Sequence, residues 1–384
     1  MDACRVLIDV LIVGGGPAGA ACAWQLRRPG QHVDADVAIL DKATFPRNKV
    51  CGGWITLPVL DELQIDPSEY ARGRVLQPIT GFRTGVIGAR ETETDYGRPI
   101  SYGIRRCEFD DYLLHRSNAR LIQGTALSSL ERMGDEWLVN GEIRARLIVG
   151  AGGHFCPVAR FLGTKSTGES VVAAQEAEFE MSSGQQAKCS IRPEIPELYF
   201  CSDLKGYGWC FRKGNFINIG LGRMDRHSLG AHISAFLDFL RRSGKITFDL
   251  PSKLFGHAYL LYGRTTRKIV DDGILLIGDA AGMAYAQSGE GIRPAIESGL
   301  LAARAIVAAR GHYSRANLDR YRELLAARFG SLREDWPTRI GRRLPPALIA
   351  SLGRALLATK WFSRHIVLDS WFLRSREPAF HLSH

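Results

Sequence analysis

Three glycines near the N-terminus, Gly14, Gly16 and Gly19, have the spacing of a loop that binds the pyrophosphate of a dinucleotide. The first glycine allows a tight turn, the second lets backbone N–H groups approach the phosphates, and the third lets a helix pack close to a strand. Asp41 follows 22 residues after Gly19, where its carboxylate can accept hydrogen bonds from both ribose hydroxyls. An acid at this position favours an unphosphorylated ribose, as in FAD or NAD.

The segments around this loop are those that must position it. Residues 9–13 form a short aliphatic run that predicts a strand, and residues 20–28 are rich in helix formers. A second apolar run, 37–40, ends at Asp41 and completes the order strand, loop, helix, strand, acid. The helix then faces the phosphates with the positive end of its dipole. The predicted cofactor-binding residues also include the neighbours of these positions, Pro17, Ala18 and Lys42.

A second glycine-rich motif lies far downstream, where residues 273–277 predict a buried strand that runs into Gly278 and Asp279. Here the sequence resembles the large FAD-binding family of glutathione-reductase type. The resemblance implies that Asp279 holds the ribityl chain of FAD; the alternative is a carboxylate that caps a helix. It also implies a segment beside the flavin pyrimidine, where N–H donors and a helix dipole would stabilise reduced flavin. The residues of that segment are Gly289, Gly291 and Ile292. Since a nicotinamide dehydrogenase does not need this second motif, FAD is the predicted dinucleotide.

Three shorter segments are compared with flavoprotein motifs. Residues 106–113 fit the pattern RxxFDxxL, and the resemblance implies a flavin-side contact for Arg106; the alternative is an ordinary helix start capped by aspartates. Residues 123–126 look like the strand whose backbone meets adenine, with Ala126 as the contact. Hydroxylases of the para-hydroxybenzoate hydroxylase type carry GADG where this chain has GAGG, so Gly152 replaces their aspartate. That departure weakens the hydroxylase interpretation.

The segment after Asp41 gives the most specific resemblance. Residues 45–53 have the sequence FPRNKVCGG, which resembles the FPRxKxCGG segment of the geranylgeranyl reductase family, flavoproteins that reduce isoprenoid double bonds. In that family the cysteine lies near the flavin, so Cys51 is the one catalytic candidate, and neighbouring cations could lower the pKa of its thiol. The alternative is a small packing residue beneath the ring. Cofactor contacts are also expected from Lys49, Gly52 and Gly53.

A further match concerns the substrate. Residues 207–211 and the glycines at 220 and 222 look like the YxWxF…GxG substrate-cavity motif of the same reductases. Flavin halogenases carry WxWxIP instead, and neither the first Trp nor the Ile-Pro pair is present here. The predicted substrate-binding residues are Tyr207, Trp209 and Phe211. A strand whose aromatic face serves core packing is an equally good interpretation, and the two are compatible.

Composition excludes several classes of protein. The chain has 384 residues, 45% of them hydrophobic and 23% charged, as in globular proteins. Its formal charge of +10 is not accompanied by a nucleic-acid-binding pattern, so no nucleic acid is expected as a partner. The eight cysteines form no CxxC pair, which indicates a reduced protein without a metal site. No signal peptide or transmembrane helix is expected, and a cytoplasmic location is predicted.

The expected fold class is α/β (α+β overall). We expect a discontinuous glutathione-reductase-type FAD-binding Rossmann domain from 1–60, 100–160 and 263–310. An antiparallel-sheet substrate domain would be inserted at 61–99 and 161–262, and residues 311–384 would form a helical, basic C-terminal region. In that region Leu344, Leu348, Leu352, Ala355 and Leu356 share one helix face. They would either close the active-site cavity, which we favour, or contact a membrane surface.

These patterns predict an FAD-dependent oxidoreductase that reduces a C=C bond of an isoprenoid-like or other hydrophobic small molecule. Reduced flavin would deliver the hydride, and NAD(P)H or another electron donor would reduce the flavin. One alternative is a flavin-dependent monooxygenase of a small aromatic or natural-product substrate, since this scaffold hosts many chemistries. An alternative of another class is a non-catalytic module that binds flavin or lipid.

Overall fold

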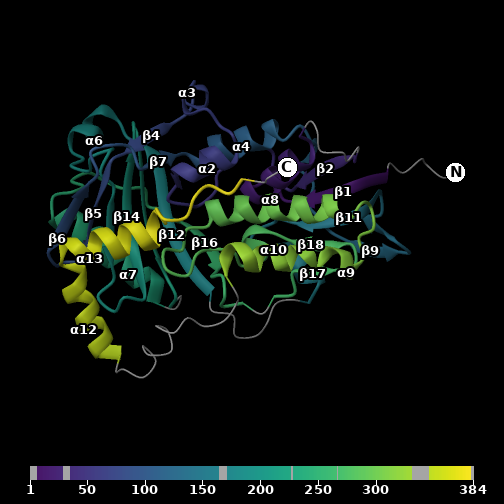
Figure 1. Cartoon of the computed structure of the whole chain (residues 1–384). Helices are drawn as coiled ribbons and strands as arrows, with labels where there is room; N and C mark the ends of the chain where they lie inside the picture. Colours follow the sequence, from purple (N-terminus) through teal and green to yellow (C-terminus); the bar gives the residue numbers. More distant parts are fainter. Residues whose placement is uncertain are drawn as a thin grey trace.

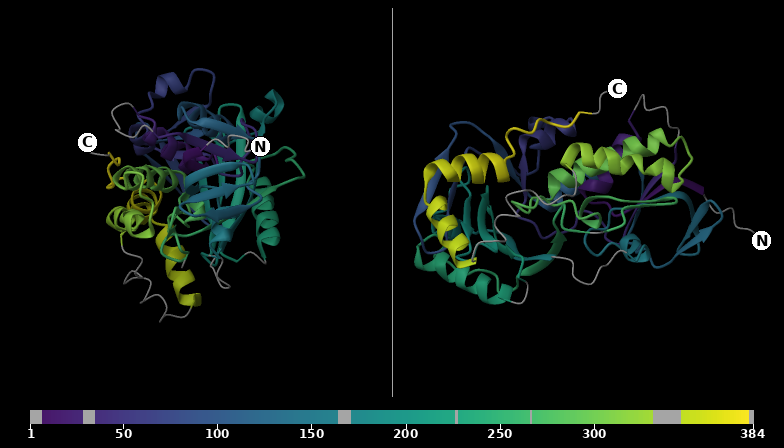
Figure 2. Two further views of the ribbon diagram at one scale, coloured as in Figure 1. Left: turned by 90° about the vertical axis from the view of Figure 1, so that its right-hand side faces the viewer. Right: turned by 60° about the horizontal axis from the view of Figure 1, so that its bottom comes forward.

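Two sheets at opposite ends of an elongated molecule carry most of the fold (Figure 1). The structure is a computed structural model, and it describes residues 7–28, 35–163, 171–225, 228–265, 267–330 and 346–381. An eight-stranded sheet holds the predicted dinucleotide loop, and a seven-stranded sheet forms the other end. Figure 2 shows helices packed along the outside of both sheets. The predicted α/β class with a Rossmann-like domain and a second sheet is confirmed.

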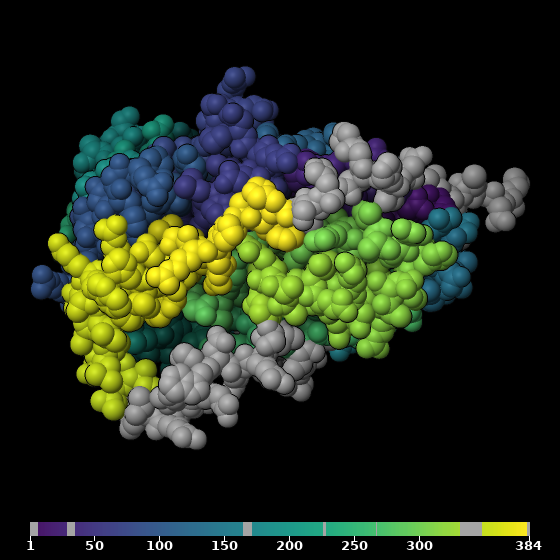
Figure 3. Space-filling view, viewed as in Figure 1, coloured from purple at the N-terminus to yellow at the C-terminus, as the bar shows by residue number. Residues whose placement is uncertain are grey.

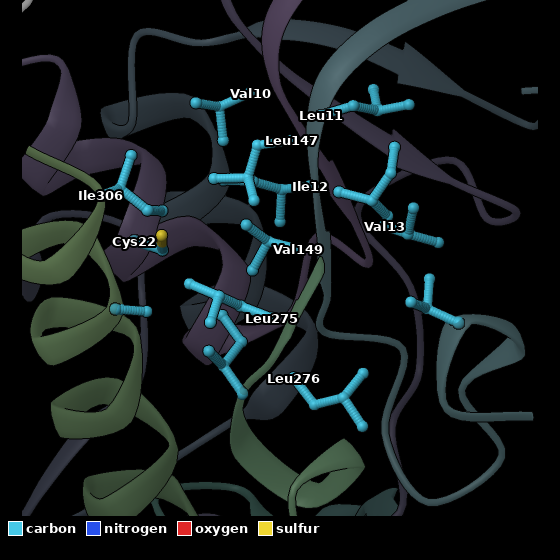
Figure 4. Close-up of a cluster of buried hydrophobic side chains, with 14 of the residues drawn as sticks. Val10, Leu11, Ile12, Val13, Cys22, Leu147, Val149, Leu275, Leu276 and Ile306 are labelled. Atoms are coloured by element: carbon cyan, nitrogen blue, oxygen red, sulfur yellow. The ribbon is translucent and has the colours of Figure 1, made fainter. Parts of the chain in front are cut away.

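The eight-stranded sheet is built from hydrophobic runs that lie far apart in the sequence. Its parallel strands, in spatial order, are β18 (Ile274–Leu276), β11 (Ile143–Gly150), β1 (Leu7–Val13), β2 (Val37–Asp41) and β8 (Arg120–Gln123). Antiparallel neighbours are β17 (Val270–Asp271), β10 (Glu136–Val139) and β9 (Leu130–Met133). The central strands are rich in Val, Ile and Leu because both of their faces are buried. Figure 4 shows this cluster, which includes Val10, Ile12, Leu147, Val149 and Leu275.

Two helices enclose the dinucleotide loop. Helix α1 (Pro17–Leu26) follows β1 directly, as the sequence predicts, and α8 (Ile292–Ala308) packs against it. The close approach depends on Gly299, where a Cβ atom would lie 2.3 Å from the carbonyl oxygen of Ala18. Helix α4 (Arg106–Arg116) also contacts α1. The remaining helices beside this sheet are α5 (Pro157–Phe161), α9 (Arg315–Leu318) and α10 (Arg320–Phe329).

The seven-stranded sheet is antiparallel except between β13 and β5. Its strands, in spatial order, are β16 (Phe255–Leu260), β12 (Val171–Glu180), β15 (Phe216–Arg223), β14 (Gly206–Lys213), β13 (Glu197–Phe200), β5 (Gly81–Val86) and β6 (Glu91–Asp95). Helix α7 (Leu229–Arg242) covers one face, where the Phe236 ring would meet a Cβ atom on Gly208 at 2.7 Å. The short helix α6 (Ser183–Ala187) follows β12.

A small sheet alternates in the sequence with strands of the seven-stranded sheet. It consists of β3 (Trp54–Thr56), β7 (Ser101–Ile104) and β4 (Leu76–Ile79), with α2 (Leu57–Glu62) and α3 (Pro67–Tyr70) between its strands. Because β3 directly follows the Cys51–Gly53 segment, this sheet fixes where that segment ends. The domain limits expected from the sequence stay predictions.

The C-terminal segment crosses the molecule. It comprises α12 (Pro346–Leu357), α13 (Lys360–Phe362) and the π-helix η3 (Ser363–Phe372). In Figure 3 residues 346–381, in yellow, run from the seven-stranded sheet toward α8. The carbonyl oxygens of Glu377 and Pro378 accept hydrogen bonds from Arg293 of α8, which fastens the segment there.

One expectation about this region is wrong. The helix face that we expected to close the cavity is exposed, with Leu348, Leu352 and Leu356 each about half accessible to solvent and Ala355 also exposed. The core is instead contacted by other residues of the segment, Leu357, Val367, Leu368, Phe372 and Leu373. Leu344 lies outside the described residues. Within the described ranges, every helix is too short or too polar to cross a bilayer.

Candidate active site

The first glycine loop has the geometry that a pyrophosphate requires. Gly14 has a φ of +119°, and a Cβ atom there would lie 2.5 Å from the Ala151 carbonyl oxygen. A Cβ atom on Gly19 would lie 2.0 Å from the carbonyl oxygen of Gly14. Gly16 caps α1, and only an Arg47 nitrogen, 3.5 Å away, lies within 4 Å of its Cβ position. The tight positions build the turn, and the open one leaves room for phosphate oxygens beside the helix N-terminus.

The predicted ribose acid also braces this loop. One Asp41 oxygen accepts a hydrogen bond from the Gly15 N–H at 2.7 Å, and the other accepts one from the Ala43 N–H at 2.8 Å. Lys42 is exposed in the turn after β2, and its role at a cofactor stays a prediction. Ala126 lies beyond the end of β8, not on a strand as we expected, because that strand stops at Gln123. Its carbonyl oxygen accepts a hydrogen bond from Asn140.

The second motif lies where the sequence predicted, at the end of β18. Gly278 has a φ of +60°, and a Cβ atom there would meet the Ala18 methyl at 2.9 Å, so this loop touches the first one. Gly291 caps α8 and Ile292 is its first residue. A Cβ atom on Gly291 would lie 3.5 Å from an Asp279 oxygen. Asp279 therefore lies beside the start of α8 but does not cap it, and the helix-cap alternative is not what the structure shows.

Asp279 belongs to a buried polar cluster that sequence reasoning found only in part. His257 Nε2 lies 3.3 Å from an Asp279 oxygen, and Lys49 Nζ lies 2.9 Å from His257 Nδ1. Burial lowers the pKa of Lys49 to about 8, an effect to which the charge of Arg106 adds. Burial also lowers the pKa of His257, against the opposing effect of Asp279. The sequence gives no signal for His257, because only the pairing of β16 with β12 brings it here.

The Cys51 segment is hydrogen-bonded to side chains from the seven-stranded sheet. The Cys51 N–H donates to Glu176 Oε1 at 2.5 Å, and the Cys51 carbonyl oxygen accepts from Asn218 Nδ2 at 3.1 Å. Gly53 has a φ of +63°, and a Cβ atom there would lie 2.3 Å from Lys213 Nζ. A larger residue at either end of the Cys51–Gly53 segment would displace the segment. Neither Glu176 nor Asn218 was a sequence candidate.

Arg106 supports this segment from the other side. It is the first residue of α4, is buried, and forms two hydrogen bonds to Asp110 at 2.7 and 2.8 Å. Arg47 lies 3.3 Å from the same carboxylate. Asp110 therefore pairs with arginines, Asp111 lies 3.2 Å from His115 Nδ1, and the N-cap Arg105 makes no side-chain cap.

One face of the seven-stranded sheet, the inner face, is turned toward Cys51 and has two halves. Its aromatic half consists of Tyr207, Trp209, Phe211, Leu198 and Phe200. Its polar half consists of Glu176, Glu178, Lys213, Asn218 and His257. The halves are joined by a hydrogen bond of 2.7 Å from Trp209 Nε1 to Asn218 Oδ1.

The aromatic half lies against both glycine-rich segments. A Cβ atom on Gly52 would lie 3.4 Å from Trp209 Nε1 and 3.5 Å from the Phe211 ring. The Tyr207 hydroxyl donates to the Ser288 carbonyl oxygen, directly before Gly289. Phe372 of the C-terminal segment closes this half, with its ring centroid 5.3 Å from that of Tyr207. The three predicted substrate residues are thus brought together beside Cys51, and they also pack in a hydrophobic cluster.

The residues present fit FAD. Two glycine turns touch each other at Ala18 and Gly278. Helix α1 begins at the first turn and the start of α8 lies beside Asp279 of the second, so that a phosphate-bearing dinucleotide has two positive helix ends nearby. A carboxylate stands at each turn, Asp41 at one and Asp279 at the other. Glycine at positions 52 and 53 lets this segment lie close to Trp209 and Lys213 of the seven-stranded sheet.

Known proteins share this arrangement. Residues 12–66 match the family model of the NAD(P)-binding Rossmann-like domain. The chain is 30% identical over 319 residues to the menaquinone reductase of Mycobacterium tuberculosis (strain ATCC 25618 / H37Rv), covering 77% of this chain and 75% of that protein. It is 26% identical over 309 residues to the digeranylgeranylglycerophospholipid reductase of Methanocaldococcus jannaschii, covering 77% and 75%.

Solved structures share the fold. A geranylgeranyl bacteriochlorophyll reductase-like protein from Thermoplasma acidophilum superimposes with a TM-score of 0.76 at 19% identity, covering 96% of this chain and 99% of that one. The flavin-dependent brominase Bmp2 superimposes with a TM-score of 0.65 at 18% identity, covering 97% of both chains. At these identities the likeness is one of fold alone, and reductases and halogenases use the same scaffold.

Proposed function

This chain is a member of the geranylgeranyl reductase family of FAD-dependent oxidoreductases, and on that premise we propose that it reduces a carbon–carbon double bond in a hydrophobic, isoprenoid-like molecule. Two relatives are named for menaquinone and for a digeranylgeranyl lipid. The observation that carries the proposal is the contact of the aromatic half of the inner face with the Cys51–Gly53 segment. An apolar chain bound on that half would place its double bond beside the flavin ring.

Each end of FAD has its own set of residues. The loop from Gly14 to Gly19 and the helix after it would bind the pyrophosphate, and Asp41 would meet the ribose. Asp279 and Lys49 would meet the ribityl chain and the ring, in the space where they now contact His257. When bound and reduced, FAD supplies the hydride.

The chain's own residues do the rest. The N–H groups and the positive dipole end at the start of α8 would favour negative charge on a ring bound beside them. The aromatic half and Phe372 exclude water from the apolar chain of the substrate. Glu176 and Asn218 hold the Cys51 peptide at both its N–H and its carbonyl oxygen, which fixes the thiol in one place. Electrons would come from NAD(P)H or another donor in solution.

The test is anaerobic. Enzyme whose flavin has been photoreduced is mixed with geranylgeraniol or with menaquinone, and flavin reoxidation is followed by absorbance while products are analysed by mass spectrometry. We expect reoxidation together with a product that has gained hydrogen, and a Trp209→Ala variant that is about 10- to 100-fold slower because the bound chain is misplaced. Phe161→Ala, which changes an exposed ring beside the other sheet, is the control. A product that gains oxygen in air, without reduction under nitrogen, would indicate a monooxygenase and contradict the proposal.

We also propose that the exposed face of α12 and α13 rests on an anionic bilayer, from which a lipid-like substrate would come. Leu348, Leu352 and Leu356 are exposed there, and Trp361 is 65% accessible. The flanking cations Arg354, Lys360 and Arg364 are exposed as well. Apolar side chains ringed by cations match the surface of a membrane with anionic lipids. The opposite side of the segment covers the aromatic half, so the bilayer and the substrate site lie on either side of one short helical layer.

Sedimentation with vesicles tests this contact. We expect the protein to bind vesicles containing phosphatidylglycerol more strongly than vesicles of phosphatidylcholine, and the double variant Leu352→Glu/Leu356→Glu to lose that binding. Met133→Glu, another exposed apolar residue but in β9, should bind as the wild type does. Equal binding by the double variant and the wild type would contradict the proposed surface.

A further inference from the structure

The polar half of the inner face contains a buried acid, Glu176, that has no chemical role in the function proposed above. Glu176 is 4% exposed, and its Oε1 accepts the hydrogen bond from the Cys51 N–H. Its Oε2 is buried and has no hydrogen-bond partner among the described residues. One oxygen of this carboxyl group therefore holds the Cys51 peptide while the other is unused.

The groups around Glu176 bind one another instead. Lys213 Nζ donates to Glu178 at 2.6 Å and to the Ile104 carbonyl oxygen at 2.8 Å. Asn218 Nδ2 donates to Glu178 and to the Cys51 carbonyl oxygen, both at 3.1 Å. Arg105 is another cation of this cluster, and its Nε lies 3.7 Å from Glu178 Oε1. On the next strand, β16, Phe255 pairs with Glu176, and His257 is directed to Asp279.

Glu176 lies close to the substrate motif. Glu176, Gly220 and Trp209 are paired in register across β12, β15 and β14, so their side positions share the inner face. A Cβ atom on Gly220 would lie 2.3 Å from the Trp209 ring and 2.7 Å from the Glu176 Cβ atom. The glycine thus lets the indole and the acid lie next to each other, beside the backbone of Cys51.

A buried carboxylate oxygen without a partner is costly, whereas a protonated carboxyl group is neutral and can donate to a ligand. Burial raises the pKa of Glu176 to about 7, and the Cys51 N–H, Lys213 and the Asn218 amide oppose that rise only in part. Glu178 adds to the rise through its negative charge. The group can therefore carry a proton near neutral pH and release it in a reaction, which is what a general acid requires.

We propose that Glu176 is the proton donor of the reduction, which delivers the proton of Oε2 to the alkene carbon next to the one that receives the hydride. This inference rests on the proposed function. The C=C π bond, the O–H bond of Glu176 and the bond that would hold the hydride in the reduced flavin break, and two C–H bonds form. The two electrons come from the reduced flavin, which is oxidised, and Glu176 becomes a carboxylate that is reprotonated from water. The hydrogen bond from the Cys51 N–H stabilises that carboxylate after the transfer.

The variant Glu176→Gln keeps an oxygen that can accept from the Cys51 N–H but has no acidic proton. Glu180→Gln is the matched control, because Glu180 lies on the same strand and the same face but is exposed. Both are studied as FAD-loaded proteins with photoreduced flavin, and geranylgeraniol and menaquinone are the probes. We expect Glu176→Gln to bind FAD as the wild type does and to reduce the probes at least about 100-fold more slowly in a single turnover. Glu180→Gln should be unchanged.

A second measurement does not depend on turnover. Infrared difference spectra of the substrate-free holoprotein between pH 5 and pH 9 should show the carbonyl stretch of a protonated carboxyl group that titrates near neutral pH. Glu176→Gln should lose part of this signal. Because Glu290 is a second buried acid whose pKa burial raises to about 7, the spectra are compared with those of Glu290→Gln, and each variant should remove a different component.

The outcomes separate the two proposals. Wild-type protein that reduces neither probe would contradict the proposed function, and this inference with it. Reduction by Glu176→Gln at the wild-type rate would overturn the inference and leave the proposed function intact, and so would an infrared spectrum in which Glu176 is ionised throughout. If Glu176→Gln loses FAD, Glu176→Asp serves in its place. If Glu176→Asp recovers both the reduction rate and the infrared signal of the protonated carboxyl group, proton donation is supported. If the rate recovers without that signal, proton donation is contradicted.

Discussion

The two sheets meet the candidate site with different parts of the chain. On the eight-stranded side the site is backbone, since a Cβ atom at Gly14, Gly19 or Gly278 would lie within 3 Å of a neighbouring atom. On the seven-stranded side the site is side chains, brought from β12, β14, β15 and β16 to one face by strand register. A turn of this kind is specified by residues a few positions apart. A sheet face is specified over tens of residues, and a slip of one residue would direct every side chain to the opposite face.

This difference predicts the largest effect for a change in the first region. In Gly19→Val the new Cβ atom would lie 2.0 Å from the Gly14 carbonyl oxygen, and neither backbone segment can move away. We expect loss of FAD binding and a decrease of about 3 kcal/mol or more in the free energy of unfolding. Flavin content and urea denaturation would measure both effects. Gly184→Ala, where a Cβ atom meets nothing within 4 Å, should change neither.

A change on the side-chain half should separate the two regions. In Gly220→Val the new side chain would collide with the Trp209 ring and with Glu176, but it is remote from the glycine turns. We expect FAD to bind normally and kcat/KM for a prenyl substrate to fall about 100-fold, because the ring and the acid are both displaced. Gly256→Ala, with an ordinary contact of 3.9 Å, is the control on β16, which β12 separates from β15. Equal loss of flavin in the two variants would show that the regions are not independent.

Each region has a buried acid, and pH should reveal the one beside the flavin loop. Burial raises the pKa of Glu290 from 4.5 to about 7. The folded protein therefore keeps a proton that the unfolded chain releases, and the stability that Glu290 contributes below pH 4.5 is lost as the pH rises to about 7. Glu290→Gln should be more stable than the wild type at pH 8 by about 1–3 kcal/mol, and the difference should vanish near pH 4. Thermal unfolding at both pH values measures this, with exposed Glu142→Gln as the control.

The glycine turns on the eight-stranded side could be predicted from the sequence. The first glycine motif, Asp41, the strand before Gly278 and the helix at Ile292 were all predicted, because each is specified by a few adjacent residues. The same holds for the aromatic alternation of residues 207–211, which β14 shows. The fold class followed from these elements.

The polar half of the inner face could not be predicted from the sequence. Glu176, Asn218 and His257 carry no local pattern, and each becomes a neighbour of Cys51 or Asp279 only through pairing between strands. The apolar face of α12 was predicted as a face, but its partner was not, because amphipathicity does not say whether protein or another surface covers a helix.

The smallest effects should distinguish two lysines that the sequence treated alike. Lys49 lies in the cluster with His257 and Asp279, whereas Lys42 is exposed. Lys49→Met should weaken FAD binding about tenfold, since it removes a partly desolvated cation from the ring and ribityl end. Lys42→Met should change the Kd less than about twofold, because an exposed lysine contributes little. Fluorescence titration of the apoprotein with FAD measures both constants. If Lys42→Met has the larger effect, the turn after β2 closes on the cofactor. FAD binding on the eight-stranded side would then also depend on a side chain, Lys42, as the sequence predicts.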